Sequence, residues 1–253
     1  MPASFDRIAD RYDETRALDE SVLQRIAEEL ERELTTSSRI LETGVGTGRI
    51  AAPLQRCGFD IVGLDISRKM LSRAIEKDVS TVLLADITAL PFMDDSFDHV
   101  LSVHVTHLIG DWIAALQEMS RVASNRFVAV VSDREGCDVR AMGRVYEDRC
   151  AEMGFEVAHP GIEEQDIADV AAPFRTVHVA DVEDGMSSAE AIERYRSRTY
   201  SDQWNVPDDV HEYAVDGLLE LFEHGSDLKR REQISMMVWH VEDIRKGLLE
   251  LRR

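Results

Sequence analysis

The amino-acid sequence predicts an α/β fold: a doubly wound, mostly parallel sheet of seven strands, with a helical insertion before the last strand. Short apolar runs alternate with helical periods from about residue 20 to residue 135. The runs carry no polar face, as expected for strands of a parallel sheet that helices cover on both sides. Short connections between them predict right-handed crossovers, which place a ligand at the carboxyl edge of the strands.

The first half of the chain supplies five of the expected strands. A capping box at Ser21-Val22-Leu23-Gln24 opens a helix whose apolar stripe ends at Leu34. A glycine cluster follows the first strand and leads into a helix of about ten residues. The later helices are expected at 67–77, capped by Ser67, and at 111–122. The strands are expected at 39–42, 61–64, 81–84, 99–103 and 127–131.

The second half is less regular. Residues 138–153 have a helical pattern, and strands are expected at 176–179 and 234–241. The long segment between these two strands contains two helix starts, a capping box at Ser187-Ser188-Ala189-Glu190 and the tripeptide Pro207-Asp208-Asp209. We interpret it as a helical lid.

The chain therefore divides into three predicted parts. Residues 1–36 form an N-terminal helical leader, and residues 183–229 form the lid insertion. Residues 37–182 and 230–253 together form the α/β core.

Composition limits the classes of function. With 29 Lys+Arg against 49 Asp+Glu the formal net charge is −20, and 44% hydrophobic residues suffice for a full core. Such an acidic chain repels phosphates at long range, which argues against a nucleic-acid partner. The acidic excess fits either adaptation to a salty cytoplasm or a by-product of genome composition.

Cysteine use and hydropathy indicate a location. Cys57, Cys137 and Cys150 are odd in number and include no C-x-x-C pair, which favours a reducing compartment over a disulfide framework or a zinc site. No apolar run approaches ~18 residues, and the N-terminus lacks the apolar region of a signal peptide. We expect a soluble, cytoplasmic protein without a membrane segment.

The strongest chemical signal is the segment Glu42-Thr43-Gly44-Val45-Gly46-Thr47-Gly48, between a strand and a helix. Glycines there allow positive φ and let a ligand lie against bare backbone at a helix N-terminus. The dinucleotide fingerprint G-x-G-x-x-G has its third glycine one position later, where this chain has Arg49. A tight turn without a ligand is the alternative interpretation.

Acidic residues end the next two strands. Asp65 can accept hydrogen bonds from both hydroxyls of a ribose, which fits an adenosine ligand or NAD. Asp86 can accept from an adenine amino group, with Ile87 against the ring. Each aspartate alone could instead be a helix cap, but both together with the glycine cluster favour a nucleoside site.

These motifs together resemble the class I S-adenosylmethionine-dependent methyltransferases, in particular the small-molecule enzymes with a methyltransferase type 11 core. The resemblance covers about residues 39–135 through the segments Ile40–Ile50, Val62–Ser67 with Met70-Leu71, and Ala85–Phe92. Glu42 stands where many members carry Asp. The resemblance implies a Rossmann-like fold with S-adenosyl-L-methionine as cofactor and S-adenosyl-L-homocysteine as product.

It also implies which residues bind the cofactor. The segment Phe5–Asp13 resembles the family's leader, which folds over the cofactor, and His104 matches a position that often borders the sulfonium. The implied cofactor contacts are Tyr12, Glu42, Gly44, Gly46, Gly48, Asp65, Ile66, Met70, Asp86, Ile87 and His104. Packing of the leader on the core is the alternative role for Tyr12.

Catalysis and acceptor binding are less constrained. His104 and His107 are candidate general bases or substrate contacts, because imidazole titrates near neutral pH. A metal held by these two histidines is the alternative, but no further ligand cluster is visible, so no metal is predicted. Tyr195, Tyr200 and Trp204 of the insertion are candidate substrate contacts or, alternatively, core of the lid.

The sequence thus predicts an S-adenosylmethionine-dependent methyltransferase that acts on a small-molecule acceptor through oxygen or nitrogen. An NAD(P)-dependent oxidoreductase is the first alternative, disfavoured by Arg49. A non-catalytic S-adenosylmethionine-binding regulatory protein is the second. The identity of the acceptor and the oligomeric state are left open.

Overall fold

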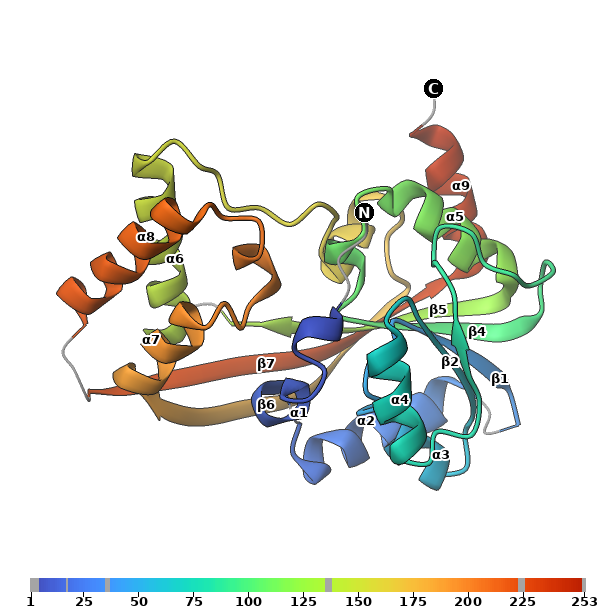
Figure 1. The fold of residues 1–253 in the computed structure, drawn as a ribbon. Helices are drawn as coiled ribbons and strands as arrows, with labels where there is room; N and C mark the ends of the chain where they lie inside the picture. Colours follow the sequence, from blue (N-terminus) through green and yellow to red (C-terminus); the bar gives the residue numbers. More distant parts are fainter. Residues whose placement is uncertain (1–4, 17, 35–36, 135–137, 223–225, 252–253) are drawn as a thin grey trace. The chain divides into compact units, whose positions relative to one another are not determined.

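The computed structural model describes residues 5–16, 18–34, 37–134, 138–222 and 226–251. Its strands form one sheet of seven, in the order β3-β2-β1-β4-β5-β7-β6 (Figure 1). The sheet is mostly parallel, with one antiparallel hairpin, which confirms the predicted doubly wound fold. The strands are β1 Arg39–Thr43, β2 Asp60–Asp65, β3 Val82–Leu84, β4 Phe97–Val103, β5 Ala123–Asp133, β6 Arg175–Ser187 and β7 Asp227–His240.

Strand pairing around β1 sets the position of the carboxyl edge. Leu41 of β1 pairs in parallel with Val62 of β2 on one side and Val100 of β4 on the other. The three strands therefore end side by side, and the turns that follow them meet at one edge. The candidate ligand-binding residues are predicted from the sequence to lie at this same edge.

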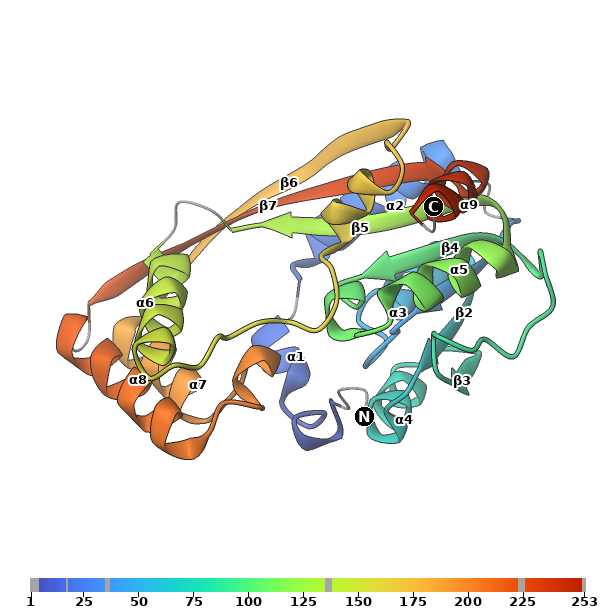
Figure 2. The same ribbon diagram turned by 90° about the horizontal axis from the view of Figure 1, so that it is seen from above.

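Helices flank and connect these strands. Helices α2 and α3 lie on one face of the sheet, and α5 and α9 lie on the other (Figures 1 and 2). The α-helices are α1 Tyr12–Arg16, α2 Glu20–Glu33, α3 Ala51–Arg56, α4 Arg68–Glu76, α5 Trp112–Val122, α6 Asp138–Glu152, α7 Ser188–Arg196, α8 Asp208–Leu221 and α9 Val241–Glu250. The 3-10 helices are η1 Phe5–Arg7, η2 Thr106–Leu108, η3 Glu164–Asp169 and η4 Ser201–Gln203. Within these described residues, no helix is both long and apolar enough to cross a membrane.

Two local predictions were wrong. Helix α2 begins at Glu20 after Asp19, so the predicted capping box at Ser21 lies inside the helix. Gln24 of that box instead donates a hydrogen bond to Glu28, one turn further on. Helix α3 has six residues rather than about ten. Pro53 lies in its first turn, where a missing backbone N–H is tolerated.

The contacts divide the chain into two compact units. Unit 1 comprises residues 1–131, 160–180 and 235–253, and unit 2 comprises 132–159 and 181–234. The predicted insertion 183–229 falls within unit 2. Unit 2 also holds α6, which the sequence analysis assigned to the α/β core.

Each unit has its own apolar core. In unit 1, the buried Trp239 ring packs edge-on against Phe127 at 5.8 Å, and its Nε1 donates to the Ala171 carbonyl oxygen at 2.6 Å. In unit 2, Met142, Tyr146 and Cys150 of α6 cluster with buried residues of α7 and α8. These apolar side chains of α6 explain why that helix belongs to unit 2.

Candidate cofactor-binding site

The glycine cluster forms the turn between β1 and α3. Gly44, Gly46 and Gly48 all have positive φ, at 68°, 56° and 73°. A Cβ on Gly44 would lie 2.5 Å from the Val105 side chain, and one on Gly48 would lie 2.6 Å from Val79. A Cβ on Gly46 would meet no atom closer than 3.9 Å. A side chain at Gly44 or Gly48 would therefore collide with the core, whereas the space beside the Gly46 backbone is open.

Asp65 at the end of β2 ties this turn to the next helix. Its carboxylate accepts hydrogen bonds from the backbone N–H groups of Gly46 at 2.9 Å and Ser67 at 2.7 Å. Burial raises the pKa of Asp65, and the bonds from Ser67 and Gly46 oppose that rise. Each carboxylate oxygen has two lone pairs, so Asp65 can shape the loop and still accept from a ligand hydroxyl.

Glu42, near the end of β1, has a buried carboxyl oxygen that lacks a hydrogen-bond partner. Its side chain is 2% exposed, and its Oε2 has no hydrogen-bond partner. Burial raises the pKa of Glu42 to about 8, although Arg49 lowers it. A buried carboxyl oxygen without a partner calls for a donor from a ligand. The ammonium of S-adenosylmethionine is such a donor. Glu42 and the open backbone of Gly46, four residues further on, therefore fit that cofactor.

Around the turn lie the predicted apolar contacts. Met70 is buried, and its Cε would lie 4.0 Å from a Cβ on Gly46. Ile66, next to the half-buried Asp65, is 38% exposed. Ile87 belongs to the core of unit 1, while Asp86 accepts hydrogen bonds from the backbone and hydroxyl of Thr88.

Carboxylates fasten the N-terminal leader to α4 and to the glycine turn. Asp6 accepts hydrogen bonds from the Ser67 hydroxyl and from the Lys69 backbone. Asp10 forms an ion pair with Arg73. The sequence analysis did not single out these pairs.

Asp13 reaches the glycine turn itself. Its Oδ1 accepts from the Thr47 hydroxyl at 2.6 Å, and its carboxylate pairs with Lys77, which also donates to Thr47 at 3.1 Å. Tyr12, the preceding residue, is half-buried and packs edge-on against Phe5 at 5.8 Å. Asp13, the neighbour of Tyr12 in sequence, thus ties the leader to the glycine turn.

The two candidate histidines belong to the turn after β4. His104 has a left-handed backbone with φ 54°, and His107 lies in η2. The ligand atoms of His107, Glu163 and Glu164 lie within 4.8 Å of one another. Glu163 already caps η3, and Glu164 accepts three hydrogen bonds from the end of β4 and the turn after it, so both carboxylates have roles without a cation.

The candidate acceptor residues cluster in unit 2. Tyr195 is buried, with ring centroids 5.1 Å from Tyr146 and 5.3 Å from Tyr200. Trp204 donates its Nε1–H to the Arg198 carbonyl oxygen at 2.9 Å. The sequence analysis missed Tyr146, whose hydroxyl lies 2.6 Å from Nδ1 of the buried His211. Its position on the apolar stripe of the predicted helix 138–153 was the available signal.

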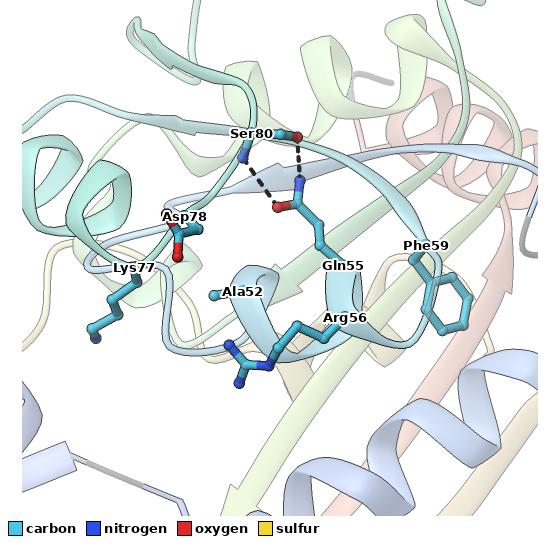
Figure 3. Close-up of a pocket in the computed structure, with 7 residues that line it drawn as sticks. All are labelled: Ala52, Gln55, Arg56, Phe59, Lys77, Asp78 and Ser80. Carbon is cyan, nitrogen blue, oxygen red and sulfur yellow. Dashed lines mark hydrogen bonds between the residues drawn. The ribbon is translucent and has the colours of Figure 1, made fainter.

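A separate surface hollow of about 390 Å³ lies elsewhere on unit 1 (Figure 3). Its residues come from α3 and from the segments that precede β2 and β3, so it lies away from the carboxyl edge. Gln55 exchanges two hydrogen bonds with Ser80 there. The lining residues are Ala52, Gln55, Arg56, Phe59, Lys77, Asp78 and Ser80.

Known proteins share this arrangement. Residues 41–127 match the family model described as a methyltransferase domain. Malonyl-[acyl-carrier protein] O-methyltransferase of Halorhodospira halophila is 34% identical over 127 residues, 48% of this chain and 43% of that protein. The chain thus spans less than half the length of this relative.

Two further relatives are matched over more of their length. The uncharacterized protein MJ1123 of Methanocaldococcus jannaschii is 32% identical over 154 residues, 60% of this chain and 70% of that protein. Demethylmenaquinone methyltransferase of Corynebacterium glutamicum (strain R) is 28% identical over 161 residues, 62% of this chain and 70% of that protein.

A solved structure supports the fold alone. The YcgJ protein of Bacillus subtilis superposes with a TM-score of 0.55 at 16% identity, covering 87% of this chain and 98% of that protein. The family match begins within β1 and ends within β5, the stretch that contains the glycine turn, Asp65 and Asp86. The chain belongs to the class I S-adenosylmethionine-dependent methyltransferases.

Proposed function

We propose that this chain transfers a methyl group from S-adenosylmethionine to a small organic acceptor. The observation that carries the proposal is the buried carboxyl of Glu42, whose Oε2 lacks a partner beside the glycine turn. A cation or hydrogen-bond donor satisfies that oxygen, whereas the pyrophosphate of NAD offers it only further acceptor oxygens. Glu42 therefore separates this proposal from the oxidoreductase alternative more sharply than Arg49 does.

The proposed roles of the chain's residues follow from the groups they present. Glu42 holds the ammonium, Asp65 the ribose hydroxyls, and Asp86 with Ile87 the adenine. When bound, the cofactor supplies a methyl group on a positively charged sulfonium, which needs alignment with the acceptor and exclusion of water. His104 and His107 are proposed as bases for an acceptor that must lose a proton.

The nature of the acceptor rests on two lines of support. The named relatives methylate demethylmenaquinone or malonyl-[acyl-carrier protein], according to their names. The net charge of −20 disfavours a nucleic-acid acceptor. A role for Tyr195, Tyr200 and Trp204 in acceptor binding stays a prediction. It is tested by measuring the KM for the acceptor in Tyr200→Phe and Trp204→Phe and comparing each with wild type.

Calorimetric titration with S-adenosylmethionine, S-adenosylhomocysteine and NAD, run side by side, tests the cofactor. We expect micromolar binding of the first two and none of NAD, and loss of binding in Glu42→Leu. Binding of NAD alone would contradict the proposal. A panel of phenols, carboxylates and amines, followed by detection of S-adenosylhomocysteine, then tests turnover, and binding without any turnover would favour the regulatory alternative.

A further inference from the structure

A buried carboxylate holds the turn after β4. Glu164 of η3 is 1% exposed. Its Oε1 accepts hydrogen bonds from the backbone N–H groups of Val105 at 2.6 Å and Thr106 at 3.2 Å. The Ser102 hydroxyl donates to the same oxygen at 3.3 Å. Three donors, one from the end of β4 and two from the turn after it, thus converge on a single oxygen of a residue about sixty positions away in sequence.

The segment that carries Glu164 fits closely against this turn. The Gly161 N–H donates to the His107 carbonyl oxygen at 2.9 Å, and the Thr106 hydroxyl donates to the Ile162 carbonyl oxygen at 2.7 Å. A Cβ on Gly161 would lie 2.1 Å from the Thr106 carbonyl oxygen, so only glycine allows this approach. The contacts of Gly161 and Ile162 with the turn therefore fix the position of Glu164 relative to it.

The same turn contacts the glycine loop. The Val105 side chain occupies the space beside Gly44 and would lie 2.5 Å from a Cβ there. His104, one residue earlier, has φ 54°, a left-handed conformation that is unfavourable for a residue other than glycine. Such a conformation persists only where its surroundings enforce it. Glu164 supplies that support through the next two peptide N–H groups.

We propose that Glu164 is a positioning residue for cofactor binding: by holding the backbone of Val105 and Thr106, it seats the turn after β4 against Gly44. The inference rests on the proposed function, because it concerns the cofactor of that reaction. All three donors use one oxygen of Glu164, so a side chain that keeps a single acceptor oxygen at this position should still hold the turn.

The test measures affinity for S-adenosylhomocysteine by calorimetry, and the melting temperature without ligand, in four proteins. Glu164→Ala removes the acceptor, whereas Glu164→Gln keeps an acceptor oxygen and the size of the side chain. Asp169→Ala, which removes an exposed carboxylate from the same η3, is the matched control. We expect affinity about tenfold weaker in Glu164→Ala, and within about threefold of wild type in the other two.

Two results with the Glu164 variants would overturn the proposal. Unchanged affinity in a folded Glu164→Ala would leave Glu164 a role in stability only, and affinity as weak in Glu164→Gln as in Glu164→Ala would assign the effect to charge. If Glu164→Ala does not fold, Val105→Ala carries the test, because it keeps the backbone donors but removes the methyl groups beside Gly44. Affinity equal to wild type in Val105→Ala would contradict the proposal. Failure of wild type to bind would instead refute the proposed function.

Discussion

Glu42 and Asp65 stand at the ends of neighbouring strands, yet their hydrogen bonds differ. Asp65 accepts two backbone N–H groups, which offset part of the cost of burying it. The Oε2 atom of Glu42 has no such compensation. Unsatisfied buried carboxyls with raised pKa are concentrated at functional sites, where a ligand completes them. Ligand binding should therefore change the ionisation of Glu42.

This difference predicts a pH dependence of binding. Burial raises the pKa of Glu42 to about 8, so at pH 7 the free protein holds a proton there that an ammonium ligand displaces. Affinity for S-adenosylhomocysteine should therefore rise with pH, by up to about tenfold per unit between pH 6 and 8, and level off above that. The number of protons released when the ligand binds is measured by calorimetry in two buffers that differ in their enthalpy of ionisation.

The stability of the free protein should show the opposite trend. A carboxyl whose folded pKa is raised binds its proton more tightly in the folded state, so folding stability falls as pH rises from about 4.5 to 8. Glu42→Gln cannot ionise and should remove both dependences. If the variant and wild type share one pH profile for binding, Glu42 does not contact the ammonium.

Gly46 gives a second prediction at the residue scale. A Cβ there would meet no protein atom closer than 3.9 Å, so Gly46→Val should fold but lose detectable cofactor binding. Its positive φ of 56° should still cost roughly 1–2 kcal/mol of stability. Gly44→Ala is the contrast, because its Cβ would overlap Val105 and should lower the melting temperature further. Calorimetry and thermal melts separate the two effects, and full affinity in Gly46→Val would remove Gly46 from the site.

At the scale of elements, the leader depends on α4. Asp6, Asp10 and Asp13 recur every three or four residues and contact the start, middle and end of that helix. Each exposed ion pair of this kind contributes little to stability, but together these contacts hold the leader against α4. Because Lys77 binds both Asp13 and Thr47, it connects the leader to the glycine turn.

Lys77→Met should therefore loosen the leader. We expect faster thermolysin cleavage before residue 20 and affinity for S-adenosylhomocysteine weaker by about two- to fivefold, the scale of a partly exposed ion pair. Lys246→Met, on α9, removes an exposed lysine whose ammonium pairs with Asp243 of the same helix, and it should change neither cleavage nor affinity. Unchanged cleavage and affinity in Lys77→Met would assign Lys77 to the surface alone.

Prediction of the elements from sequence succeeded where the signal was local. The glycine cluster, Ser67 as the cap of α4 and the apolar runs of β1 to β5 each lie within a few residues. The lengths of β6 and β7 were underestimated, because their polar outer residues carry no apolar pattern. Glu164 escaped notice for a similar reason: its partners Ser102, Val105 and Thr106 are brought to it only by the fold.

At the scale of the whole molecule, the two units explain which predictions could be made. The motifs of unit 1 are short and ordered along strands, so both the sheet and the family could be predicted from them. The aromatic cluster of unit 2 joins Tyr146 of α6 to His211 of α8, a pairing that no spacing in the sequence indicates. Acceptor recognition therefore requires experiment.

The charge of −20 gives the last prediction. Repulsion among excess carboxylates destabilises the folded state, and salt screens it, since the Debye length falls from about 14 Å at 0.05 M to 3 Å at 1 M. The melting temperature at pH 7 should therefore rise by several degrees between 0.05 and 1 M KCl. Near pH 5, close to the sequence pI of about 4.7, the net charge almost vanishes and the gain should shrink. An equal gain at both pH values would instead indicate a general salt effect on apolar burial, and a fall at pH 7 would mean that ion pairs such as those of the leader outweigh the repulsion.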